Sequence, residues 1–159
     1  MRSLPTVDFF GHEVSLLICG GNPLSGFSHV SAELDREMIE YYNMPNLLAL
    51  LDDCWAQGIN TFQSRGDRHQ MRMYLEHRQN GGKMKWIAQT ASEFTSIPGN
   101  IAEIAQYKPI AIYHHGTHTD NSNQAEENAA LVRKIIGSGA AAASRPARTH
   151  APAPKPRGS

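Results

Sequence analysis

The sequence lacks several features that would place it in a functional class at once. Two of its 159 residues are cysteine, and fifteen lysine and arginine residues balance fifteen aspartate and glutamate residues. Two cysteines do not indicate a disulfide framework, and the balanced charge gives no reason to expect nucleic acid as a partner. The longest apolar stretch near the start, residues 16–19, is far too short for a membrane-spanning helix or a signal-peptide core. We therefore expect a cytoplasmic protein without a membrane partner.

The balanced total conceals an uneven distribution of charge. Residues 140–159 hold four basic groups and no acidic one, so residues 1–139 carry eleven basic against fifteen acidic groups, a net charge of −4. The same twenty residues contain no aromatic and no large aliphatic side chain. Such a segment cannot bury enough apolar surface to offset the entropy of ordering. We therefore expect one domain over residues 1–139 and a disordered Ala/Pro/Arg-rich tail over residues 140–159.

Strand-like and helix-like segments alternate along residues 1–139. Short apolar runs of strand length cover residues 14–19, 59–62, 84–90 and 110–113. Helical spacing of apolar residues predicts helices over residues 31–42, from Pro45 to Gly58, after Asp67, after Pro98 and over residues 125–136. Strands that alternate with helices in this way predict an α/β fold with a parallel sheet and right-handed crossovers. Cys19 and Cys54 fall in a predicted strand and a predicted helix, where we expect both to be buried as small hydrophobes.

Three stretches resemble the aldo/keto reductases, which are TIM (β/α)8 barrels that use a nicotinamide cofactor. Residues 11–21, G-H-E-V-S-L-L-I-C-G-G, are similar to the family's opening hairpin and first barrel strand. Residues 58–62, G-I-N-T-F, are similar to its second strand, and residues 110–116, I-A-I-Y-H-H-G, to its fourth, which ends in a histidine in the family. The resemblance implies NADP(H) as cofactor and a small molecule as substrate. A complete barrel needs about 250 residues, so we predict a parallel (βα)4 segment, the N-terminal half of such a barrel.

Three positions depart from the catalytic pattern that the resemblance implies. Family members carry an aspartate directly after the second-strand phenylalanine, where this chain has Gln63. The expected tyrosine acid falls near Arg68, and the third strand ends Q-T-A-S where the family has a lysine. Of the four positions, His115 alone matches. Because a histidine without the tuned acid cannot supply the proton for hydride transfer, we expect an oxidoreductase-like chain that shows no NADPH-dependent carbonyl reduction by itself.

Polar side chains follow the predicted strands, at the edge of a parallel sheet where ligands bind. We predict His115 and Glu93 as a catalytic acid/base pair. The predicted substrate contacts are Asn22, Gln63, Arg65 and Gln89. Arg65 either clamps a carboxylate or phosphate or faces water, and Asp67 is expected to cap the helix that follows it.

Two further interpretations remain open on the sequence. The run H-H-G-T-H-T-D over residues 114–120 supplies His115, His118 and Asp120, which with Glu93 would suit zinc or another divalent metal in a metal-assisted isomerase or hydrolase. An alternative to the metal site is that the same run forms an exposed histidine-rich loop with one packed histidine. The second interpretation of the whole chain is an inactive, truncated fragment.

Because four strands of an eight-stranded barrel leave two unpaired edges, we also expect a homodimer that pairs them.

Overall fold

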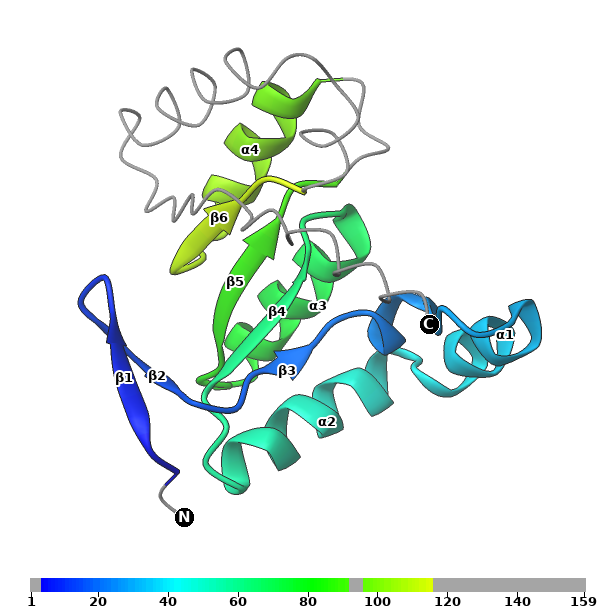
Figure 1. The fold of residues 1–159 in the computed structure, drawn as a ribbon, viewed down its shortest axis with the longest axis horizontal. Helices are drawn as coiled ribbons and strands as arrows, with labels where there is room; N and C mark the ends of the chain where they lie inside the picture. Colours follow the sequence, from blue (N-terminus) through cyan, green and yellow to red (C-terminus); the bar gives the residue numbers. More distant parts are fainter. Residues whose placement is uncertain (1–3, 92–95, 116–159) are drawn as a thin grey trace, which may run out of the picture.

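The computed structural model describes residues 4–91 and 96–115 and has an α/β fold built on a parallel sheet (Figure 1). Strands β1 (Thr6–Phe9) and β2 (His12–Ser15) form an antiparallel hairpin at the start of the chain. The parallel sheet has the order β3-β4-β5-β6 in the described residues. Its strands are β3 (Cys19–Gly20), β4 (Thr61–Arg65), β5 (Lys85–Gln89) and β6 (Ala111–Tyr113). The predicted parallel α/β fold is therefore confirmed.

A short 3-10 turn and four α-helices connect the strands in the described part of the chain. The turn η1 (Pro23–Ser25) and helices α1 (Ala32–Tyr41) and α2 (Met44–Ala56) lie between β3 and β4. Helix α3 (Arg68–Gln79) joins β4 to β5, and α4 (Ile97–Ala105) joins β5 to β6. Each α-helix begins after a side chain that accepts a hydrogen bond from the backbone N–H three residues on. These caps are Ser31, Asn43, Asp67 and Ser96, which confirms the predicted role of Asp67.

Helices α2, α3 and α4 all pack against the same face of the sheet. Alternate strand residues on this face, Phe62, Trp86, Ala88 and Ile112, belong to one core cluster with side chains of the three helices. The helix members of the cluster are Leu47, Leu51, Met71, Met73, Tyr74, Ile101 and Ile104. The rings of Phe62 and Trp86 stack with centroids 6.1 Å apart, and Trp86 Nε1 donates to Ser64 Oγ over 2.9 Å.

The β1–β2 hairpin packs on the opposite face of the sheet. Val14 of β2 packs with Ile87 and Ala111 in a second, smaller core cluster. Ser15 and Asn60 hold the hairpin to the amino end of β4, because the Ser15 N–H donates to Asn60 Oδ1 and the Asn60 N–H donates to Ser15 Oγ, both over 3.0 Å. The hairpin therefore covers part of this face, and the side chains nearer the carboxyl ends of the strands remain half-buried.

The predicted strand over residues 14–19 is wrong. Strand β2 ends at Ser15, whose Oγ donates to the Leu17 carbonyl over 2.6 Å, and β3 begins at Cys19. Leu16, Leu17 and Ile18 between them are 60%, 58% and 43% exposed. The bonds of Ser15 to Leu17 and to Asn60 turn the chain here, so the apolar run is an exposed bend rather than one buried strand.

The boundaries of the other predicted strands and helices differ less from those in the structure. The predicted second strand, residues 59–62, begins at Thr61, because Asn60 is engaged with Ser15. Helix α1 contains no buried residue, and its Tyr41 is 64% exposed. The helix predicted over residues 125–136 and the tail over residues 140–159 lie outside the described residues.

Cys19 and Cys54 are both half-buried free thiols rather than fully buried side chains. Burial, together with the neighbouring Cys54 side chain, raises the pKa of the Cys19 thiol to about 12. Cys19 therefore stays protonated at neutral pH and packs against the main core cluster as a small apolar group.

Among the helices of the described residues, none is both long and apolar enough to cross a membrane.

Candidate functional site

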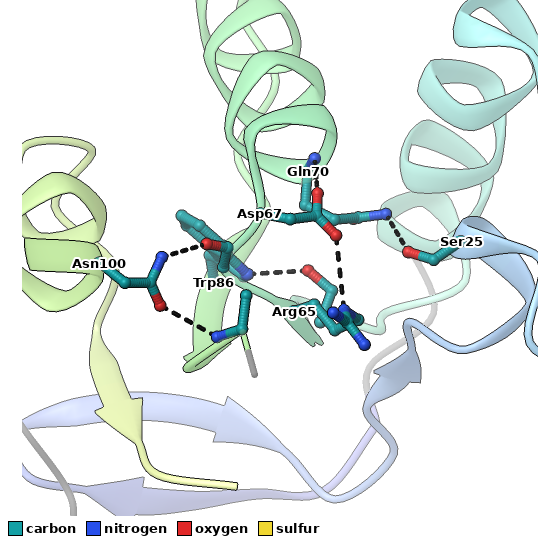
Figure 2. Close-up of polar contacts among 9 residues, drawn as sticks. Ser25, Arg65, Asp67, Gln70, Trp86 and Asn100 are labelled. Atoms are coloured by element: carbon teal, nitrogen blue, oxygen red, sulfur yellow. Dashed lines mark hydrogen bonds and ion pairs between the residues drawn. The ribbon is translucent and has the colours of Figure 1, made fainter. Parts of the chain in front are cut away.

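The carboxyl ends of β4 and β5 are fixed by a buried asparagine of α4 (Figure 2). Asn100 Nδ2 donates to the Gly66 carbonyl over 2.7 Å, and its Oδ1 accepts from the Ala91 N–H over 2.9 Å. The Gly66 N–H in turn donates to the Gln89 carbonyl over 2.6 Å. Since Asn100 is 1% exposed, these bonds set the starts of two adjacent loops at the sheet edge where ligands bind in parallel α/β folds.

Gln63, Gln89 and Tyr113 form what we call the polar face, on the side of the sheet away from the helices. Strand alternation places all three there, and the sheet register pairs Gln89 with Tyr113. Gln63 Nε2 donates a hydrogen bond to Tyr113 Oη, so the two residues meet across β5. Burial raises the pKa of the Tyr113 phenol, against a smaller opposite effect of this hydrogen bond. The phenol therefore stays neutral, and its own proton is available for a further acceptor.

Thr90 joins the ends of β5 and β6 beside this face. Its backbone N–H donates to the Tyr113 carbonyl over 2.9 Å, and its Oγ1 accepts from the His115 N–H over 3.2 Å. Oγ1 also lies 2.8 Å from His114 Nδ1. The side chain of the buried Thr90 thus contacts the chain at both histidines.

Of the two predicted catalytic residues, His115 and Glu93, His115 alone lies within the described residues. Strand β6 ends at Tyr113, so strand alternation does not determine which sides His114 and His115 face. His115 is placed through its backbone bond to Thr90. Glu93, His118 and Asp120 lie outside the described residues. Within residues 4–91 and 96–115, no group of three or more His, Cys, Asp or Glu side chains is arranged to hold a metal ion.

Arg65 lines a pocket of about 400 Å³ between the β3–α1 connection and the start of α3, which we call the Arg65 pocket. The pocket is lined by Leu24, Ser25, Phe27, Ile39, Tyr42, Arg65, Asp67 and His69. The Arg65 guanidinium lies 5.2 Å from the centre of the Phe27 ring, and its Nε lies 3.6 Å from Asp67 Oδ2. Asp67 Oδ1 accepts from the Gln70 N–H over 2.9 Å, so one carboxylate both caps α3 and faces Arg65 (Figure 2).

Three of the four predicted substrate residues lie on the same side of the sheet. Gln63 and Gln89 belong to the polar face, and Arg65, two residues after Gln63 and paired with Gln89 in the register, lies on that side and also lines the Arg65 pocket. Asn22 is exposed in the loop after β3, where its Nδ2 lies 3.0 Å from His29 Nε2. Sequence reasoning missed Tyr113, although strand alternation from Ala111 was a signal that could have placed it on the same face as Gln63.

Comparison of the chain with models of protein families, with curated proteins and with solved structures finds no match in any of the three.

Proposed function

We propose that the chain is an aldo/keto reductase-like domain that binds a small carbonyl compound on the polar face. The winding of the sheet supports the barrel part of this proposal. Four parallel strands follow one another in chain order, and α2, α3 and α4 all pack on one face. Continued winding of this kind curls a sheet toward a (β/α)8 barrel, whereas doubly wound sheets reverse their strand order and carry helices on both faces. The hairpin before β3 agrees with the family's opening segment.

The observation that carries the binding function is the hydrogen bond from Gln63 to Tyr113. Gln63 donates to the phenol oxygen, so the Tyr113 O–H can donate to a carbonyl oxygen of a ligand. The raised pKa of Tyr113 keeps this donor protonated across the physiological range. Gln89, in register with Tyr113, adds an amide that can accept or donate beside it.

NADP(H), the cofactor that the resemblance implies, does not fit the charges at this edge. Arg65 Nε faces Asp67 at 3.6 Å, and Arg68 Nε faces Glu103 at 3.4 Å. A pyrophosphate would therefore meet a carboxylate beside each of these arginines. We derive no hydride-transfer step from these residues, and the proposed function is binding of the carbonyl compound.

The test is titration of the full chain with 4-nitrobenzaldehyde, followed by NMR of the Gln63 and Gln89 side-chain amides. We expect saturable shifts of both amides, and Tyr113→Phe should weaken binding about fivefold, as the loss of one hydrogen bond of about 1 kcal/mol predicts. Tyr41→Phe makes the same change at an exposed tyrosine of α1 and should leave binding unchanged. Unsaturable shifts, or equal affinity of Tyr113→Phe and the parent chain, would overturn the proposal. Adding NADPH should give no aldehyde reduction.

A further inference from the structure

The Arg65 pocket combines apolar walls with two polar side chains that are held by one buried residue. The walls are largely aliphatic or aromatic, from Leu24, Phe27, Ile39 and Tyr42. Apolar walls with a few fixed polar groups are the usual composition of a small-molecule site, and 400 Å³ lies within the usual range of about 300–1,000 Å³. The fixed polar groups therefore decide which apolar ligand the pocket fits.

Gln70 of α3 fixes these two polar side chains, Ser25 and Asp67 (Figure 2). Its backbone N–H donates to Asp67 Oδ1 over 2.9 Å, and its side-chain Nε2 donates to Ser25 Oγ, also over 2.9 Å. The Gln70 side chain is 0% exposed, and its Oε1 has no hydrogen-bond partner among the described residues. A buried oxygen without a partner costs stability. The Gln70 amide therefore serves to orient the Ser25 hydroxyl rather than to stabilise the core.

Ser25 and Asp67 can each make one further hydrogen bond, of opposite kind. Ser25 Oγ accepts from Gln70, while its own O–H donates to none of the described residues and can donate to a ligand. Asp67 Oδ1 caps α3, whereas Oδ2 lies 3.6 Å from Arg65 Nε, beyond hydrogen-bond distance, and can accept from a ligand. The pocket therefore offers one donor and one acceptor, both positioned by the same residue.

We propose that the Arg65 pocket binds a neutral alcohol with an apolar body. The ligand hydroxyl would accept from Ser25 Oγ and donate to Asp67 Oδ2, and its apolar body would lie against Phe27 and Ile39. Because Gln70 holds both polar side chains before binding, the ordering cost of the complex is low. The pocket includes no residue of the polar face, so this site goes beyond the function proposed above.

Charged ligands would satisfy one of the two polar side chains but not both. A carboxylate has no proton to donate to Asp67 and would face its negative charge. An ammonium group has no lone pair, so it cannot accept from the Ser25 hydroxyl. A hydroxyl both donates and accepts on a single atom, which is why a neutral alcohol fits this pair.

Four probes that share a phenyl ring test the proposal by NMR on the full chain. 2-Phenylethanol donates and accepts, its methyl ether only accepts, and 2-phenylethylamine and 3-phenylpropionate carry a positive and a negative charge. We expect 2-phenylethanol to give saturable shifts of the Gln70 side-chain amide and none of the Asn100 side-chain amide, which is buried beside α4. It should bind about fivefold more tightly than each of the other three, as the loss of one hydrogen bond predicts.

The first variant removes the donor of the pocket. Ser25→Ala should weaken 2-phenylethanol about fivefold. Ser96→Ala makes the same change at the cap of α4, outside the pocket, and should change the affinity less than about twofold. An unchanged affinity in a folded Ser25→Ala would overturn the proposal.

A second variant keeps the test decisive if Ser25→Ala fails to fold. Ile39 is 64% exposed, so Ile39→Asp should fold, and its charge on the apolar wall should abolish binding of 2-phenylethanol. Val30→Asp, at a residue that is 79% exposed and outside the pocket, should leave binding unchanged. The proposal would be overturned by unchanged binding in Ile39→Asp, by another probe that binds as tightly as 2-phenylethanol, or by shifts at Gln63 and Gln89 in place of Gln70.

Discussion

Gly21 lies so close to Ser64 that no side chain fits between them. A Cβ atom on Gly21 would lie 2.5 Å from Ser64 Cβ and 2.7 Å from the Gln63 carbonyl oxygen. Gly21 is the second of two adjacent glycines, and the first, Gly20, is the last residue of β3. In the structure, β4 itself occupies the space beside the second glycine.

This contact predicts different outcomes for two adjacent substitutions. Gly21→Ala must push β3 away from the backbone of β4, and we expect it to lower the free energy of unfolding by about 1–3 kcal/mol, as overpacking of a core does. Gly20→Ala places the same methyl group where no atom lies within 4 Å, so the change should stay within about 0.5 kcal/mol. Urea denaturation of both variants checks this. Equal stabilities would show that the β3–β4 packing is not as tight as described.

The burial of His77 should make the stability of the fold depend on pH. Its side chain is 2% exposed, its Nε2 accepts from the Met84 N–H over 3.3 Å, and Asp52 Oδ1 lies 3.6 Å from Nδ1. Burial lowers the pKa of His77 below its ordinary 6.5, and the smaller effect of Asp52 acts in the opposite direction. The unfolded chain therefore binds this proton more readily than the folded chain. Stability should be fully present above pH 6.5 and fall as the pH drops from 6.5 toward the lower pKa of the folded state.

The measurement is the free energy of unfolding at several pH values between 5 and 8. His77→Gln removes this titration, so its stability should depend less steeply on pH than that of the parent chain. His69→Gln replaces an exposed histidine of the same helix and should keep the parent slope. A parent slope that persists unchanged in His77→Gln would contradict the assignment.

The order of elements could be predicted from the sequence because its signals are local. Asp67 caps the start of α3, and Gly58, with a φ of +91°, follows the end of α2. Both residues lie within a few positions of the helix that they delimit, as predicted. The strand at residues 14–19 failed because the decisive contact, between Ser15 and Asn60, joins residues 45 positions apart. A local apolar pattern contains no information about such a partner.

The candidate site was predictable only in its position along the strands. Chain order in a parallel sheet places Arg65 and Gln89 at the carboxyl ends of β4 and β5, whereas Gln63, predicted to follow its strand, lies in the middle of β4. Which of them share a face depends on register, which placed Gln63 with Tyr113. The contact of Arg65 with Phe27, a residue of the β3–α1 connection, follows from no spacing rule in the sequence.

We expect two copies of the chain to associate through the edges of the parallel sheet. Strands β3 and β6 are the outer strands of the described sheet, and the exposed Leu16, Leu17 and Ile18 lie directly before β3. Two copies related by a two-fold axis can pair β6 of each with β3 of the other and cover these side chains. We expect sedimentation velocity to show a dimer at micromolar concentration. Leu17→Lys should shift it to monomer, whereas Val30→Lys, at an apolar residue that is 79% exposed beside α1, should leave the dimer intact. A parent chain that sediments as a monomer throughout, or a dimer that Leu17→Lys does not weaken, would rule out pairing through this edge.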